Sequence, residues 1–197
     1  MGTRNRSDHA SDPPPDSAAL RDAALAYLAR YAATEAGLRR VLERRIDRWA
    51  RDADGDRDVV TSQAAEAKRA AAGVVTGLAT AGAVSNAAFA ESRARNLARS
   101  GRSRRAIAAS LIAKGVDTET MHRVLPSDDA ETEFVSALAL ARRRRIGPFR
   151  AGGVPDADGR RRELAVLARA GFPQDVARRA LETPADEATD LVERLRR

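Results

Sequence analysis

Apolar residues recur along most of the chain at helical spacing, and short polar breaks separate one run from the next. In the first run they stand at Leu20, Ala24, Tyr27, Leu28 and Tyr31, which places five side chains on one face of a helix. Thr34 is a favourable N-cap for a second helix. The apolar face of that second helix consists of Leu38, Val41, Leu42, Ile46 and Trp49. The pattern predicts helices throughout.

The ends of the predicted helices carry repeated signals. Ser103 and Asp117 are expected N-caps, and Gly115 is placed as the C′ residue of the helix that contains Leu111. Val116 then contacts Leu111, as the Schellman motif requires. Leu167, Gly171 and Phe172 show the same spacing. Two helices are therefore predicted to end in the same way.

An alanine-rich stretch at residues 61–81 is predicted to be a third long helix, with Val74, Val75 and Leu78 as its apolar anchors. Three glycines lie within it or just after it: Gly73, Gly77 and Gly82. In a membrane such spacing can mark a helix-dimer face, but the charged residues of this stretch favour close packing within a water-soluble bundle. No run of about 18 apolar residues occurs anywhere, so no membrane contact is expected.

When the chain is placed in register on Leu42, Leu111 and Leu167, three related units appear, each of three helices. We predict an N-terminal disordered arm at 1–17, repeats at 18–82, 83–127 and 128–182, and a C-terminal helical tail at 183–197. In the first unit Ile46 stands at the place of the C′ glycine. The predicted fold is all-α, with tandem three-helix repeats that form an elongated, curved array.

The excess of arginine suggests that such an array binds a partner that carries negative charge. The net charge is +7, and only Lys68 and Lys114 among the 35 basic residues are lysine. Guanidinium groups bind phosphate and carboxylate groups in bidentate fashion. The candidate partner-binding residues are Arg39, Arg40, Arg44 and Arg45; Arg102, Arg104 and Arg105; Lys114; Arg142, Arg143, Arg144 and Arg145; and Arg160, Arg161 and Arg162. Alternatively, the run 142–145 only complements a helix dipole while the other clusters solvate outer faces.

Disulfide, metal-binding and catalytic sites find little support in the sequence. The chain has no cysteine, and its two histidines, His9 and His122, lie far apart, so no disulfide, thiolate site or metal site is expected. Phosphate-binding loops, HExxH motifs and activated nucleophiles are also absent from the sequence. The start has no apolar h-region, which makes the cytoplasm the expected location. We expect a binding protein without cofactors, not an enzyme.

Several segments in order resemble the RecX family of bacterial regulators of the RecA recombinase. They are residues 24–28 before the LRRVLERR helix, Phe89-Ala90 leading to residues 111–116, and residues 167–172. The resemblance implies a fold of tandem three-helix repeats that lies in the groove of the RecA filament on single-stranded DNA. It also implies a regulator, and more specifically an inhibitor, that limits filament growth, ATP hydrolysis and strand exchange. We expect such a regulator to act as a monomer, with direct contact to DNA as a further option.

The alternative is a basic helical repeat module that binds DNA directly and acts without a recombinase. Charge alone supports it, because only seven residues are aromatic and none is interleaved with the basic clusters. Binders of single strands without sequence preference commonly stack bases on such aromatic rings. A comparison of bare and recombinase-coated single-stranded DNA separates the two hypotheses.

Overall fold

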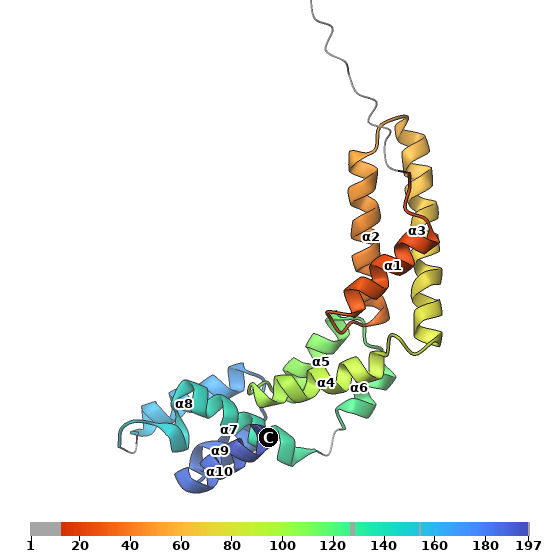
Figure 1. Cartoon of the computed structure of the whole chain (residues 1–197). Helices are drawn as coiled ribbons and strands as arrows, with labels where there is room; N and C mark the ends of the chain where they lie inside the picture. The colour runs from red at the N-terminus through yellow and green to blue at the C-terminus, as the bar shows by residue number, and fades with distance from the viewer. Residues whose placement is uncertain (1–12, 127–128, 154, 197) are drawn as a thin grey trace, which may run out of the picture. The chain divides into compact units, whose positions relative to one another are not determined.

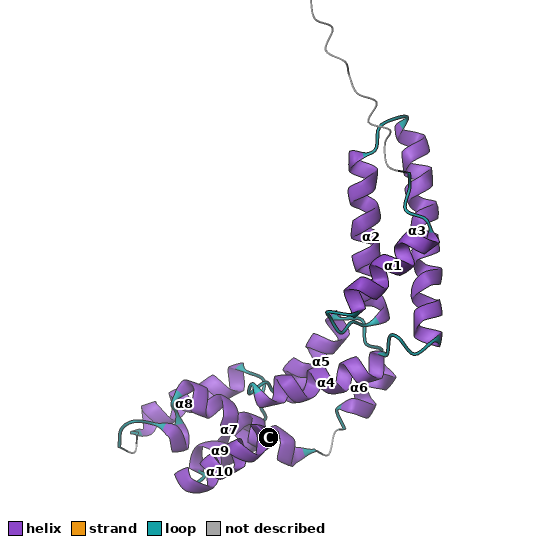
Figure 2. Ribbon diagram, in the orientation of Figure 1, coloured by secondary structure: helices purple, strands orange, loops and turns teal. Residues whose placement is uncertain are grey.

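The computed structural model describes residues 13–126, 129–153 and 155–196. Every regular element within these residues is helical, as Figure 2 shows. The predicted all-α class is confirmed, and the chain divides into two compact units, Met1–Ser85 and Asn86–Arg197. We call them the N-terminal unit and the C-terminal unit.

The N-terminal unit is a bundle of three helices around one core (Figure 1). Its elements are α1 (Ser17–Leu28), α2 (Glu35–Asp52) and α3 (Arg57–Thr80). Thr34 caps α2 as predicted, because its side-chain oxygen accepts a 2.9 Å hydrogen bond from the Gly37 N–H. Leu38, Leu42 and Ile46 are fully buried on the inner face of α2.

Both ends of α1 differ from the expectation. The helix ends at Leu28, so Tyr31 lies beyond it and is 52% exposed. At the other end, Asp16 caps the helix by accepting a 2.8 Å hydrogen bond from the Ala19 N–H, and Ser17 is already helical. The predicted arm is therefore too long by these two residues, and positions 1–12 lie outside the described residues.

One further expectation for the N-terminal unit was wrong. Gly73 and Gly77 do not serve close packing, because both are exposed and a Cβ added at either would meet no atom within 4 Å. Gly82 instead ends α3 with a φ of +74°. Ile46 stands where the repeat pattern places a C′ glycine, yet α2 continues to Asp52. A buried isoleucine at this position extends the apolar face and offers no left-handed residue that would end the helix.

The C-terminal unit holds two further apolar cores. Around the first lie α4 (Asn86–Arg99), α5 (Arg104–Ala113) and α6 (Thr118–Val124). Around the second lie α7 (Ala130–Arg144), the 3-10 turn η1 (Gly147–Phe149), α8 (Ala157–Arg169), α9 (Gln174–Glu182) and α10 (Ala185–Arg196). Helix α7 is the centre of this core, because every residue from Phe134 to Ala141 is buried. Ala188 and Val192 of α10 also join it, so the predicted tail contributes to the same core.

The predicted helix ends at Gly115 and Gly171 are confirmed. The Val116 N–H donates to the Leu111 carbonyl at 3.1 Å, and the Gly115 N–H donates to the Ile112 carbonyl at 2.8 Å. The Phe172 N–H makes the same bond to Leu167 at 3.2 Å. These are the two hydrogen bonds of the Schellman motif, with glycine in the left-handed position.

Candidate partner-binding surface

The first predicted cluster lies on the outer face of α2. Positions 38, 42 and 46 face the core, whereas Arg39, Arg40, Arg44 and Arg45 are all exposed. Arg39 lies 3.7 Å from Glu43, and Arg40 also has an interaction partner. Arg44 and Arg45 make no ion pair with a described residue. These two are therefore the members of the cluster that are available to a partner.

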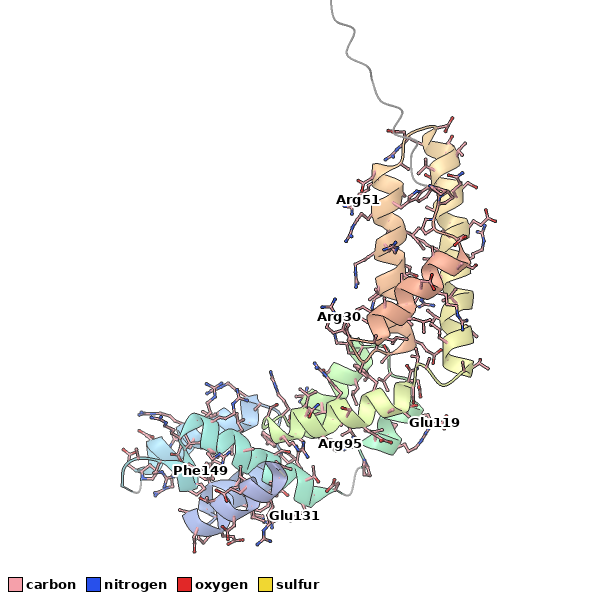
Figure 3. The ribbon with its side chains drawn as sticks, in the orientation of Figure 1. Arg30, Arg51, Arg95, Glu119, Glu131 and Phe149 are labelled. Carbon is pink, nitrogen blue, oxygen red and sulfur yellow. The ribbon has the colours of Figure 1, made fainter. Side chains whose placement is uncertain are left out.

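Helix α2 extends this basic surface beyond the predicted residues. Arg48 lies one turn after Arg44 and is exposed, and Arg51 follows in the last turn (Figure 3). The Arg51 Nε donates to the Asp47 carbonyl at 3.3 Å, so part of its guanidinium is used within the helix. The i, i+4 spacing from Arg44 was the sequence signal for Arg48.

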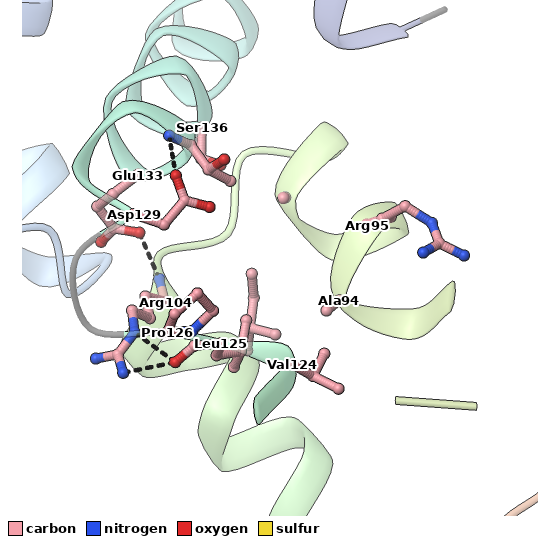
Figure 4. A pocket seen from close by; sticks show the side chains of 12 residues that line it. Ala94, Arg95, Arg104, Val124, Leu125, Pro126, Asp129, Glu133 and Ser136 are labelled. Carbon is pink, nitrogen blue, oxygen red and sulfur yellow. Dashed lines mark hydrogen bonds between the residues drawn. The ribbon is translucent and has the colours of Figure 1, made fainter. Parts of the chain in front are cut away.

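Arg104 has a role inside the protein. Its guanidinium donates twice to the Leu125 carbonyl, from Nη2 at 2.7 Å and from Nε at 3.2 Å, which ties the start of α5 to the end of α6 (Figure 4). Its neighbours Arg102 and Arg105 are exposed, and their side chains make no hydrogen bond or ion pair with a described residue. We therefore leave Arg104 out of the candidate surface and keep the other two.

The Arg104 backbone N–H also donates to Glu133 Oε2 of α7, at 2.7 Å. Both residues line a cavity of about 180 Å³ between the two bundles of this unit (Figure 4). Burial raises the pKa of the Glu133 carboxyl above its ordinary value, although the hydrogen bond from Arg104 opposes the rise. Glu133 thus joins the two bundles at the cost of partial desolvation of its charge.

The run 142–145 is not one uniform exposed turn. Arg142 is half-buried, and Arg143 Nη1 donates to the Ser100 carbonyl at 2.5 Å. Helix α7 ends at Arg144, and Arg145 adopts the left-handed conformation with φ 54°. It occupies the C′ position that glycine fills elsewhere, because the Ile146 N–H reaches back to the Ala141 carbonyl at 3.0 Å. Arg143, Arg144 and Arg145 are all exposed, and of these only Arg143 has its side chain bonded to a described residue.

The last cluster begins α8 and is partly engaged. Arg160 Nη1 donates to the Pro155 carbonyl at 2.9 Å, and Arg161 lies 3.4 Å from Asp158. Arg162 is exposed and makes no ion pair with a described residue. Lys114 is exposed at the end of α5 and has an interaction partner of its own.

The C-terminal unit brings two of the predicted clusters together. Arg102, Arg143 and Arg144 line one cavity of about 390 Å³, and they are joined there by Arg169, which the sequence analysis missed. Arg169 closes α8 directly before the Ala170-Gly171 helix end, and that position was the only sequence signal for it.

The described residues hold neither a cluster of metal-ligand side chains nor a helix able to span a membrane. Within residues 13–126, 129–153 and 155–196, no group of three or more His, Asp or Glu side chains could hold a metal ion. None of the helices in this part of the chain is both long and apolar enough to cross a membrane. His122 is exposed on α6.

Comparison with known proteins fits this arrangement of helices. Residues 85–125, which cover α4 to α6, match the family model described as RecX, second three-helix domain. The chain is 38% identical over 165 residues to the regulatory protein RecX of Myxococcus xanthus, an alignment that covers 83% of this chain and 84% of the relative. It is 33% identical over 110 residues to the regulatory protein RecX of Agrobacterium fabrum, covering 56% of this chain and 58% of the relative. With its helices, its repeated helix ends and this similarity over most of its length, the chain belongs to the RecX family.

Proposed function

We propose that this protein regulates the RecA recombinase by binding the RecA filament on single-stranded DNA. The effect is inhibition: the bound protein limits filament growth, ATP hydrolysis and strand exchange. Family membership supports a regulatory role, since both relatives are called regulatory proteins. The observation that carries the binding surface is a set of exposed arginines on helices of both units that make no ion pair within the described residues.

The chemistry of these arginines suits a nucleoprotein target. A filament presents DNA phosphates and acidic side chains, and a guanidinium group pairs with both. Because these arginines already lie in water, binding does not first have to break an internal ion pair. The protein acts by occupying the filament, not by catalysing a reaction.

The test measures ATP hydrolysis by a bacterial RecA on single-stranded DNA at increasing concentrations of the full chain. We expect the unaltered protein to suppress hydrolysis. We expect Arg44→Glu combined with Arg45→Glu, and separately Arg144→Glu combined with Arg145→Glu, to weaken the suppression at least tenfold. If the unaltered protein leaves hydrolysis unchanged, the proposal is wrong.

A matched control uses arginines that already have acidic neighbours on their own helices. Arg123 lies 3.5 Å from Glu119, and Arg95 lies 3.9 Å from Glu91. Replacing both with Glu changes the net charge as much as each test pair does. We expect this control to keep most of the suppression, and circular dichroism verifies that every variant keeps its helices.

Direct DNA binding without a recombinase is the competing function. Pull-down on bare and on RecA-coated single-stranded DNA decides between the two. Stronger capture on coated DNA supports the proposal, whereas equal or stronger capture on bare DNA favours the DNA-binding module.

A further inference from the structure

The cavity of about 390 Å³ in the C-terminal unit lies where three helix ends meet. The turn after α4 contributes Arg102, the last turn of α7 contributes Arg143 and Arg144, and the last turn of α8 contributes Arg169. These segments are up to 67 residues apart in the sequence. A hydrogen bond from the Ser103 hydroxyl to the Ala170 carbonyl, 2.6 Å long, fixes the first segment to the third.

The lining of this cavity concentrates positive charge without compensation. Its four charged residues are all arginine, and no acidic side chain contributes to it. Arg143 is held by its bond to the Ser100 carbonyl, but the side chains of Arg102, Arg144 and Arg169 make no hydrogen bond or ion pair with a described residue. Elsewhere in this unit, Arg150 and Arg179 are paired with Glu163 and Glu131. Like charges gathered around one cavity repel one another, and a bound anion would relieve that repulsion.

Helix dipoles alone do not account for the arrangement. Cations are favourable at the C-termini of α7 and α8, and Arg143 satisfies a carbonyl in the way that a capping cation does. The other three guanidinium groups bond to no backbone carbonyl. Their donors are therefore available to a group that enters from solvent.

The number and origin of these donors favour phosphate over carboxylate. A carboxylate has two oxygens in one plane, and a single guanidinium group can donate one hydrogen bond to each of them. A phosphate group carries several oxygens in a tetrahedral arrangement and can accept hydrogen bonds from several directions. Three unpaired guanidinium groups from three separate segments match that geometry.

We propose that this cavity is a binding site for a phosphate group, with Arg102, Arg144 and Arg169 as its donors and Arg143 held beside them by its bond to the Ser100 carbonyl. The phosphate comes either from the backbone of a nucleic-acid strand or from a free polyphosphate. This inference deepens the proposed function. It rests on that function only where the bound phosphate belongs to a nucleic-acid strand. The pocket itself needs no recombinase.

The test uses the full chain without recombinase and two phosphate probes, a fluorescent 20-nucleotide oligo-dT and inorganic pyrophosphate. Binding of the first is followed by fluorescence anisotropy over a series of salt concentrations, and binding of the second by calorimetry. The pocket variant combines Arg102→Gln, Arg144→Gln and Arg169→Gln. The control combines Arg93→Gln, Arg123→Gln and Arg178→Gln, three exposed arginines of the same unit that do not line the cavity.

We expect the pocket variant to lose at least tenfold in affinity for one or both probes, and the control to lose less than threefold. For the oligonucleotide, the slope of log affinity against log salt should fall by about 0.7 for each lost phosphate contact. Loss with the oligonucleotide, with or without loss of pyrophosphate binding, assigns the pocket to strand phosphates, and loss with pyrophosphate alone assigns it to a free polyphosphate. A variant with Lys at the same three positions keeps the charge but loses the forked geometry of the guanidinium group. Its affinity should therefore lie between that of the unaltered protein and that of the pocket variant.

Three results would overturn the proposal. The first is an equal loss in the pocket variant and the control, which indicates a general field effect. The second is binding of both probes that the pocket variant leaves unchanged, or no binding of either probe by the unaltered protein. The third comes from a poly-glutamate peptide titrated as an additional probe: a pocket-dependent loss for this peptide only assigns the cavity to acidic protein. If the triple variant does not fold, Arg144→Gln alone must weaken binding. Since recombinase is absent from every arm, failure here leaves the ATP hydrolysis test of the proposed function unaffected.

Discussion

A Cβ atom added to Gly101 would lie 2.6 Å from the backbone nitrogen of Leu140, which is closer than real Cβ contacts allow. Gly101 ends α4, and Leu140 belongs to the central helix of the following bundle. The glycine therefore serves two purposes at once, since its φ of +76° also ends the helix. This contact places Arg102 beside Arg143 and Arg144, so the arginine cavity depends on it.

Replacement of Gly101 by alanine should destabilise the protein by about 2 to 5 kcal/mol, because the left-handed cost and the overpacking cost add. Gly82→Ala is the matched control: Gly82 ends α3 with φ +74° and the same pair of backbone hydrogen bonds, but a Cβ there meets nothing within 4 Å. We expect about 1 to 2 kcal/mol for the control. Urea denaturation measures the free energy of unfolding of both variants. If both lose the same stability, α7 moves away from the added Cβ atom without an energetic penalty.

The buried leucines at the two Schellman ends provide a second prediction. Leu111 and Leu167 are both fully buried, so Leu111→Ala and Leu167→Ala should each cost about 2 to 5 kcal/mol. The adjacent Ile112 is 55% exposed, and Ile112→Ala should cost less than about 1 kcal/mol. Chemical denaturation tests all three. A loss below about 1 kcal/mol for either leucine would contradict its place in the core.

Features that depend on residues close in sequence could be predicted from the sequence. Thr34, Ser103 and Asp117 cap their helices, and Gly115 and Gly171 end theirs, because each motif is closed by hydrogen bonds over three to five residues. The all-α class follows from the same local periodicity. These parts of the expectation needed no knowledge of tertiary contacts.

The arrangement of the arginines could not be predicted in this way. Arg104 looks like its neighbours in the sequence, yet its guanidinium is taken up by a carbonyl 21 residues further along the chain. Arg169 stands alone in the sequence and becomes part of a cluster only because α8 ends beside the turn at Arg102. Tyr31 continued an apolar spacing after the helix had ended. For the two arginines, a contact between distant segments decided the outcome.

The raised pKa of Glu133 predicts a dependence of stability on pH. A carboxyl group that binds its proton more tightly in the folded state contributes most stability below its unfolded pKa, near 4.5, and this contribution falls as pH rises through the folded pKa. Glu133→Gln keeps an oxygen acceptor for the Arg104 N–H but carries no charge. We expect the wild type to lose stability relative to this variant between pH 4 and pH 7. Parallel urea titrations across that range measure the difference, and a constant difference would mean that Glu133 is solvated as well as in the unfolded chain.

Arg145 carries the last prediction, because it is the only non-glycine residue with positive φ among those the structure describes. A left-handed conformation costs a residue with a Cβ about 1 to 2 kcal/mol, whereas glycine adopts it freely but gives up more backbone entropy on folding. Arg145→Gly should therefore stabilise the protein by about 0.5 to 1 kcal/mol. The thermal midpoint should rise accordingly.

Arg144→Gly is the matched control, since it removes the same charge from the adjacent position. Arg144 is the last residue of α7, where glycine is disfavoured by about 0.5 to 1 kcal/mol, so this variant should be less stable than the wild type. Both variants then enter the RecA ATP hydrolysis assay. If Arg145 is held in a strained conformation because it contacts the filament, Arg145→Gly will suppress hydrolysis more weakly although it is more stable. Loss of stability in Arg145→Gly would show that the arginine side chain contributes more to the fold than its backbone conformation costs.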